Sequence, residues 1–403
     1  PHDAPLGRGE EFDLKKFHKM FQEHSLKNNY DEGYDSWNKS EIEGHTDKAD
    51  QQCRKYKIDP KKFNKTSFNN AFTNIAVCGA SRASIMTGIR PSEKRFNDFS
   101  TRASVDAPDA IPLNQIFKEN GYETISYGKI YHHNDDFAEH WTEKDNGAAQ
   151  ADFQDPESIR LRDNAETGEY GKKNPIVEYP DVDDFAYNDG KITLKAIEKF
   201  KQFSNNGKPF FMAIGYVSPH LPFIQPKKYW DMYDHDKIKL AENTYQPLNS
   251  PDIAIEAQHN SAELRKNYLG IPAEGQLDDE LSKDLIHGYY ASVSYMDAMI
   301  GKLIKGLEDA GLRENTTIIL WSDHGYHHGE KGDWGKHTLW ERTSNVPLIW
   351  SGPGIAVDAR VGTTVSLIDM YPTLVDLCRL QPVQDLEGES LAKVLGDPST
   401  AED

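Results

Sequence analysis

Four short runs of the chain combine residue types that can do chemistry. Residues 78–90, Cys-Gly-Ala-Ser-Arg-Ala-Ser-Ile-Met-Thr-Gly-Ile-Arg, place a cysteine, a serine and an arginine within five positions. Taken alone, this run is as compatible with a buried structural cysteine at a strand-to-helix junction as with a functional thiol, because free cysteine is among the most buried residue types. The other three runs bear on which interpretation holds.

A second run, Ser322-Asp323-His324-Gly325, directly follows the apolar residues 316–321, which predict a strand. An aspartate and a histidine at the carboxyl end of a strand are well placed to ligate a metal. Histidine is an uncommon ligand for calcium, which prefers oxygen, so these two residues alone also allow magnesium or a transition metal. The following histidines, 327 and 328, lie in a turn-like sequence typical of a solvated loop. We therefore expect Asp323 and His324 to be the metal ligands.

The remaining two runs also follow predicted strands. Gly128-Lys129-Ile130-Tyr131-His132 comes after the strand-like residues 124–127, and residues 215–223 place His220 between two prolines after the apolar residues 209–216. A lone histidine between prolines is more often a packed loop residue than a catalytic one. Open α/β sheets, however, place their sites beyond the carboxyl ends of the strands. The shared position of the runs therefore favours one common site.

Together the runs resemble the conserved blocks of the sulfatase family, in the alkaline phosphatase superfamily, over roughly residues 67 to 395. The run 78–90 is similar to the sulfatase signature, whose cysteine is oxidised after translation to formylglycine. Ala80 stands where the family most often has proline, which leaves open which enzyme performs the oxidation. Asp-His-Gly at 323–325 and Pro-His-Leu-Pro-Phe at 219–223 resemble iduronate-2-sulfatase-like carbohydrate sulfatases in particular.

The resemblance implies a role for each site residue. Calcium is the implied metal. Asp323 and His324 would bind it, and Cys78, as formylglycine, would be a third ligand. The metal and Arg82 would favour the oxyanion of the formylglycine. Lys129 and Lys336 would hold the sulfuryl oxygens. His132 would line the same pocket, and His220 would act as general acid. The implied catalytic residues are thus Cys78, Arg82, Lys129, His132, His220 and Lys336, and the implied metal ligands are Asp323, His324 and Cys78.

The implied reaction is hydrolysis of a sulfate monoester on a carbohydrate, such as a fragment of a glycosaminoglycan or another sulfated polysaccharide. The implied partners are a sulfated saccharide and a formylglycine-generating maturation enzyme. The implied location is the periplasm or the exterior, or the lysosome in a eukaryote. A phosphoester or phosphonate hydrolase of the same superfamily is the alternative from within enzymology.

One family feature is missing from the sequence. Sulfatases begin with a buried strand and an aspartate pair that supplies half of the calcium ligands, and residues 1–70 show no such strand and no adjacent aspartates. We favour a chain that lacks this strand, because removing a central strand leaves unpaired edges in the sheet. A substitute carboxylate is a second interpretation. An inactive relative that binds sulfated glycans is a third.

The elements that must position these residues alternate along the chain. Helix-like segments at 111–117, 189–203 and 289–307 are each followed by an apolar strand-like run. This order predicts an α/β fold with a largely parallel central sheet sandwiched by helices, as in alkaline phosphatase. We divide the chain into a polar N-terminal segment (1–70), an α/β catalytic domain (71–380) and the start of a C-terminal subdomain or linker (381–403), and we expect the family's small C-terminal sheet to be truncated.

Two polar stretches, 134–186 and 225–282, are too long for simple connections. They predict walls or lids around a site, although disorder is the competing interpretation. The second stretch offers basic and aromatic residues for gripping a sugar, namely Lys227, Lys228, Tyr229 and Trp230.

Composition excludes some functions. The net charge of -19, from 65 acidic and 46 basic residues, argues against a nucleic-acid partner, because phosphate binding needs clustered lysine and arginine. No apolar run approaches the ~20 residues that a membrane-spanning helix needs. The 3 cysteines cannot form a disulfide framework, so cysteine usage leaves the compartment open.

Overall fold

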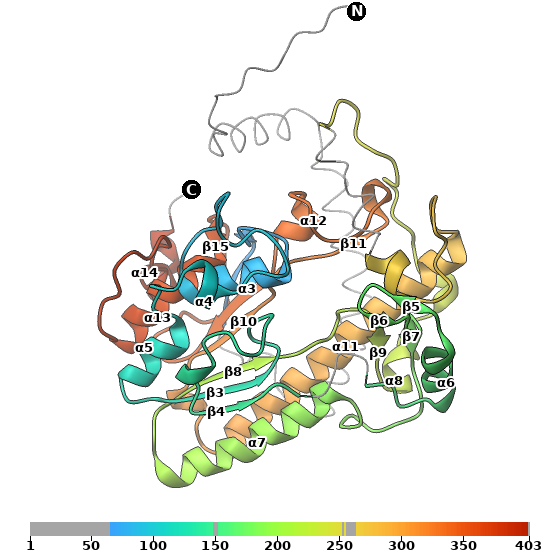
Figure 1. Ribbon diagram of the computed structural model, residues 1–403. Coiled ribbons are helices and arrows are strands. Elements are labelled where there is room, and N and C mark those ends of the chain that lie inside the picture. Colours follow the sequence, from blue (N-terminus) through green and yellow to red (C-terminus); the bar gives the residue numbers. More distant parts are fainter. Residues whose placement is uncertain (1–64, 148–151, 252–253, 255–262, 402–403) are drawn as a thin grey trace, which may run out of the picture. The chain divides into compact units, whose positions relative to one another are not determined.

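The computed structural model describes residues 65–147, 152–251, 254 and 263–401. These residues belong to one compact unit, Phe63–Asp403. Two sheets form its centre (Figure 1). The first sheet has the order β4-β3-β8 and is parallel throughout, with β4 at Glu143–Asp145, β3 at Glu123–Gly128 and β8 at Phe210–Gly215. The second has the order β10-β13-β1-β14, with β10 at Ile318–Trp321, β13 at Leu348–Ser351, β1 at Thr66–Phe68 and β14 at Ala359–Val361.

Helices cover both faces of the β4-β3-β8 sheet (Figure 1). On one face, Ile125 and Tyr127 of β3 pack against Ile192 and Ala196 of α7 (Asn188–Asn206), and the long helix α11 (Asp279–Asp309) contacts α7. On the opposite face α5 (Leu113–Glu119) packs on β3, and α3 (Cys78–Thr87) and α13 (Met370–Cys378) belong to the same hydrophobic cluster. The expected α/β fold of alkaline phosphatase type is confirmed.

The helix ends follow ordinary capping chemistry. The Asp278 side chain accepts a hydrogen bond from the backbone N–H of Leu281 at 2.8 Å and so begins α11 about ten residues before the expected position. Gly207, at a φ of 66°, ends α7 in the left-handed conformation that glycine adopts without strain. The remaining described helices are α4 (Ala103–Asp106), α6 (Pro156–Asn164), α8 (Lys227–Trp230), α12 (Glu341–Ser344) and α14 (Ala392–Gly396).

The second sheet departs from the parallel prediction. Strand β13 runs antiparallel to both β10 and β1. The connection between β10 and β13 holds only short elements, among them the four-residue helix α12, and it returns the chain against the direction of β10. Strand β1 is a buried strand inside the segment 1–70, where none was expected, since Thr66 and Phe68 are 0% and 4% exposed. Its three residues are too few to show a pattern in the sequence.

Two glycines let the ends of β3 and β8 approach closely beside the site. Gly128 has a φ of 79°, and a Cβ there would lie 2.1 Å from the carbonyl oxygen of Gly215. A Cβ on Gly215 would lie 1.9 Å from the carbonyl oxygen of Lys129. The Lys129 N–H instead donates to the Gly215 carbonyl at 2.9 Å. This close approach directs the chain after β3 across the end of β8.

The two long polar stretches carry short elements of their own. The hairpin of β5 (Thr167–Gly168) and β6 (Gly171–Lys172) lies in the first stretch, and β7 (Val177–Glu178) pairs with β9 (Phe223–Ile224) in parallel. The other short strands are β2 (Ala71–Phe72), β11 (His327–His328), β12 (Trp334–Gly335) and β15 (Val365–Ser366).

The expectation that residues 227–230 grip a sugar is wrong for the two aromatic members. Tyr229 is 1% exposed and donates a hydrogen bond to Asp184. The Trp230 ring is stacked against Tyr179 on one side, with centroids 4.0 Å apart, and against His287 at 3.5 Å. Both aromatic rings are used in packing and leave no face for a ligand.

The C-terminal residues pack into the main hydrophobic core. Leu391 and Leu395 are buried there, beside α3 and α13. Our division of the chain at residues 70 and 380 stays a prediction.

Among the described residues, none of the helices combines the length and the apolar character that a membrane span requires.

Candidate active site

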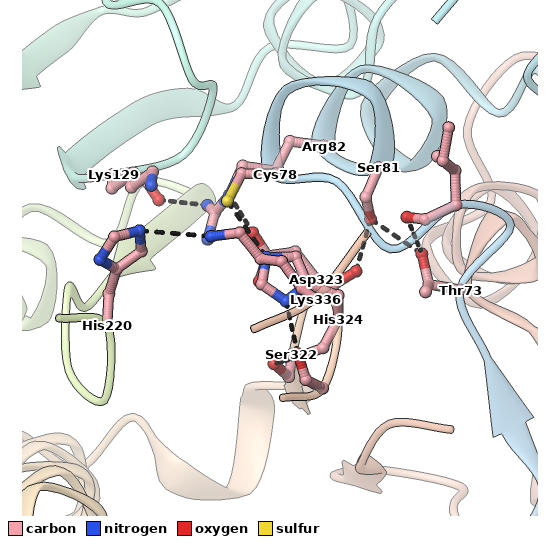
Figure 2. Close-up of polar contacts among 12 residues, drawn as sticks. Thr73, Cys78, Ser81, Arg82, Lys129, His220, Ser322, Asp323, His324 and Lys336 are labelled. Atoms are coloured by element: carbon pink, nitrogen blue, oxygen red, sulfur yellow. Dashed lines mark hydrogen bonds and ion pairs between the residues drawn. The ribbon is translucent and has the colours of Figure 1, made fainter. Parts of the chain in front are cut away.

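Cys78 is the first residue of α3 and is 4% exposed. The preceding residue, Val77, is extended and offers no side-chain cap, so the positive end of the helix dipole lies at the thiol. The Cys78 Sγ is 3.1 Å from the Nε2 of His324 (Figure 2). The His324 Nδ1 lies 2.8 Å from the carbonyl oxygen of Gly325, which can only accept, so Nδ1 carries the proton and Nε2 faces the sulfur.

The surroundings of Cys78 are cationic. Burial alone would raise the pKa of the Cys78 thiol, but Lys336, His324 and Lys129, with a hydrogen bond to His132, hold that pKa well below its usual range. Conversely, the carboxylate of Asp323 and the sulfur of Cys78 outweigh burial and raise the pKa of His324. The cations around Cys78 therefore favour an anionic nucleophile at this position, and the same cations can attract a negatively charged ester to it.

Arg82 lies one helical turn after Cys78 and ties three segments together. Its Nε donates to the Asp323 Oδ2 at 2.7 Å, and its Nη1 donates to the carbonyl oxygens of Lys129 and Ile130. Ser81, from the same helix, donates from Oγ to the carbonyl oxygen of Asp323 at 2.7 Å. Burial would raise the pKa of Asp323, but Arg82 and His324 lower it to about 2. The helix α3, which we call the signature helix because it carries the Cys78 run, thus fixes the loops that follow β3 and β10.

His220 and Lys336 meet at the site, joined by a dashed line in Figure 2. The His220 Nδ1 is 2.7 Å from the Leu221 carbonyl oxygen, so Nδ1 carries a proton and Nε2 accepts in the neutral form. The Lys336 Nζ is 3.4 Å from that Nε2. Burial and Lys336 lower the pKa of His220. Burial would also lower the pKa of Lys336, but Cys78, Glu263 and Asp323 raise it overall. Lys336 is thus the charged donor and His220 the neutral acceptor.

The structure therefore gathers all eight residues that the sequence predicted. Arg82 is committed to Asp323 rather than to Cys78, and the Nδ1 of His132 is buried without a partner in the described part of the chain. One residue escaped the sequence analysis. Glu263 lies in the second polar stretch, with Oε1 3.8 Å from the His220 Nε2 and Oε2 3.8 Å from the Lys336 Nζ. No motif surrounds Glu263, so only the folding of the stretch reveals it.

One group of possible metal ligands occurs among the described residues, formed by the Cys78 Sγ, an Asp323 oxygen and a His324 nitrogen within 4.8 Å of one another. With a thiol, this donor set suits a thiophilic ion such as zinc. Calcium takes 6–8 oxygen ligands. Oxidation of Cys78 to a hydrated aldehyde would exchange sulfur for oxygen, so the set fits one side of a calcium site and needs further carboxylates.

Comparison with known proteins identifies the family. The model of the family described as Sulfatase matches residues 16–380. The chain belongs to the sulfatase family. Human iduronate 2-sulfatase is 32% identical over 316 residues, which cover 76% of this chain and 56% of the relative. A sulfatase of Formosa agariphila is 30% identical over 342 residues, 82% of this chain and 65% of that protein. The chain thus spans less than two thirds of the length of these curated sulfatases.

Solved structures show the fold of the family. A phosphonate monoester hydrolase from Silicibacter pomeroyi superposes with a TM-score of 0.65 at 21% identity, covering 83% of this chain and 70% of that one. A 2-O GAG sulfatase superposes with a TM-score of 0.62 at 20% identity, covering 84% and 68%. At these identities the likeness concerns the fold alone, which sulfatases share with phosphonate hydrolases.

Proposed function

We propose that the protein hydrolyses a sulfate monoester on a saccharide. The observation that carries this proposal is the convergence of Lys129, His220, His324 and Lys336 on the buried Cys78 from the ends of separate strands. Membership of the sulfatase family and the named carbohydrate sulfatases among its relatives support a sulfate ester as the substrate. A terminal uronic acid or similar sugar with a 2-O-sulfate is the first substrate to try.

Each residue has a task in this reaction. Formylglycine at position 78 would supply a hydrated aldehyde oxygen that takes the sulfuryl group from the sugar, and its second hydroxyl would then expel sulfate and restore the aldehyde, which water hydrates again. Lys129 and Lys336 would hold the sulfuryl oxygens, because fixed cations in a buried site stabilise developing charge without reorganisation. Arg82 would hold Asp323 and the backbone segment that carries Lys129 in fixed positions relative to residue 78. His132 would line the pocket beside the nucleophile.

The departing sugar oxygen needs a proton when its bond to sulfur breaks. His220 is neutral in the free protein because burial and Lys336 lower its pKa. Binding of an anionic ester between Lys336 and His220 would raise that pKa and protonate Nε2, which would then donate to the leaving oxygen. His220 is therefore the proposed general acid, and Nδ1 stays on the Leu221 carbonyl throughout.

Calcium is the proposed metal, held by Asp323, His324 and the oxidised residue 78 together with carboxylates from outside the described residues. It would stabilise the oxyanion of the nucleophile. We further propose that a formylglycine-generating enzyme matures Cys78 and that the protein acts in the periplasm, outside the cell or in the lysosome.

The test compares sulfate release from defined sulfated oligosaccharides with turnover of an aryl sulfate, an aryl phosphate and an aryl phosphonate. We expect the highest kcat/KM on a sulfated saccharide. Better turnover of the phosphate or phosphonate would instead show that the protein is a phosphoester or phosphonate hydrolase. Absence of turnover on every ester, in protein with a converted residue 78, would leave a glycan-binding relative.

A further inference from the structure

Two exposed aromatic rings stand beside the candidate active site. Phe99 is 43% exposed and Tyr170 is 63% exposed, and their ring centroids lie 6.1 Å apart in an edge-to-face arrangement. The Phe99 ring also contacts the ring of His132, with centroids 6.4 Å apart. His132 in turn lies near enough to Cys78 to help lower the pKa of its thiol. Phe99 and Tyr170 therefore extend from the site toward solvent, and packing of the core does not account for their position.

Tyr170 is held in place by the second polar stretch. It lies at the turn between β5 and β6, and the Asn267 Oδ1 accepts hydrogen bonds from the backbone N–H groups of Glu169 at 2.9 Å and Tyr170 at 3.1 Å. The Asn267 Nδ2 donates to the Glu263 carbonyl oxygen at 3.0 Å. One buried asparagine thus couples the hairpin that carries Tyr170 to the helical turn that carries Glu263.

Glu263 adds a carboxylate to the two aromatic rings, and we call Phe99, Tyr170 and Glu263 the rim of the site. Its oxygens lie 3.8 Å from His220 and from Lys336, beyond hydrogen-bonding distance, and its side chain is 32% exposed. The carboxylate therefore retains capacity to accept hydrogen bonds from a ligand. It also brings a negative charge next to His220, where the sugar oxygen would leave.

We propose that Phe99, Tyr170 and Glu263 form a saccharide subsite that selects a sulfated sugar with a free hydroxyl on the carbon beside the sulfated one. The inference rests on the proposed function for the location of the sulfate. The aromatic rings offer apolar surface to the sugar ring, and tyrosine adds a polar tip. Glu263 accepts a hydrogen bond from the neighbouring hydroxyl and repels a second sulfate at that position, since like charges in a partly desolvated site are costly.

The test measures binding and turnover separately. Dissociation constants for a monosulfated saccharide and for its counterpart with sulfates on adjacent carbons are measured by calorimetry on the Cys78→Ala protein, alone and combined with rim variants. The wild-type mature holoenzyme is assayed for sulfate release from the same saccharides and from 4-nitrophenyl sulfate. Glu263→Gln is compared with Glu169→Gln, which removes an exposed carboxylate that is paired with Lys266 and lies beside Tyr170 in the β5–β6 turn.

We expect the Cys78→Ala protein to prefer the monosulfated saccharide and Glu263→Gln to reduce that preference about tenfold, the loss of one charged hydrogen bond. Glu169→Gln should keep the preference. Tyr170→Ala should weaken binding of both saccharides and Tyr170→Phe should restore it. An unchanged preference in Glu263→Gln, with thermal unfolding like that of wild type, would overturn the subsite. A preference that is present without any turnover by wild type would support the subsite and refute the proposed hydrolysis.

Discussion

Replacing Arg82 with methionine tests the buried ion pair that holds the site together. The Arg82 Nε and Asp323 Oδ2 are 2.7 Å apart, and the two side chains are 11% and 12% exposed. Removing one partner of a buried pair leaves an uncompensated charge and costs about 3–5 kcal/mol. Unfolding entropy is about 2.1 cal/mol/K per residue, so the compact unit of roughly 340 residues should lose about 4–7 °C in Tm.

The matched control is Arg102→Met. Arg102 pairs with Asp135 at 2.5 Å, but their side chains are 38% and 71% exposed, and such exposed pairs contribute little to stability. The Tm of Arg102→Met should therefore fall much less than that of Arg82→Met. Thermal unfolding is followed by circular dichroism with a chelator present, because a bound metal would itself compensate Asp323. Equal small shifts for both variants would show that the Arg82–Asp323 pair does not stabilise the fold and would refute this account of the signature helix.

Three other predictions concern the chemistry. Asp323→Ala should lose bound metal and sulfatase activity together, measured by elemental analysis and sulfate release, and activity that survives chelation would contradict the metal assignment. Lys336→Gln removes a cation that lowers the pKa of His220. Because His220, as the proposed general acid, works only below its pKa, the alkaline limb of the pH profile of kcat/KM should move to higher pH. A limb that stays in place or moves to lower pH would exclude His220 as the general acid. Asp189 is 3% exposed, and its carboxylate accepts hydrogen bonds from the backbone N–H groups of Val217 and Ser218 at 2.9 Å each. Asp189→Ala should therefore misplace His220 and reduce kcat by about 10²-fold. The control Asp183→Ala, at an exposed turn, should retain kcat.

Much of the fold was predictable because its central elements are long and regular. The helices at 189–203 and 289–307 and the strands that follow them show clear periodicity or continuous apolar runs. Lys129 directly follows β3 and Asp323 comes soon after β10; the sequence predicts that such residues meet, and the structure brings the two together. Sites in α/β folds gather beyond the carboxyl ends of strands, and here they do so although β3 and β10 belong to different sheets.

The unpredicted features depend on long-range packing. Strand β13 pairs antiparallel with β10 and β1, a direction that no local pattern reveals. Tyr229 and Trp230 have the residue types of a sugar-binding surface, but tertiary contacts bury or sandwich both rings. Glu263 reaches the site because Asn267 joins its helical turn to the hairpin of the other polar stretch. Such contacts join residues nearly one hundred positions apart, and residue type alone does not encode them.

The central claim is that residue 78 is the nucleophile in oxidised form. Its most direct test is the mass of the tryptic peptide that contains Cys78, from protein made in a host with a competent maturation system, measured alongside specific activity. We predict formylglycine in place of cysteine, incomplete in some hosts because of Ala80, and activity proportional to the converted fraction. A fully active protein whose residue 78 is an unmodified thiol would contradict the account.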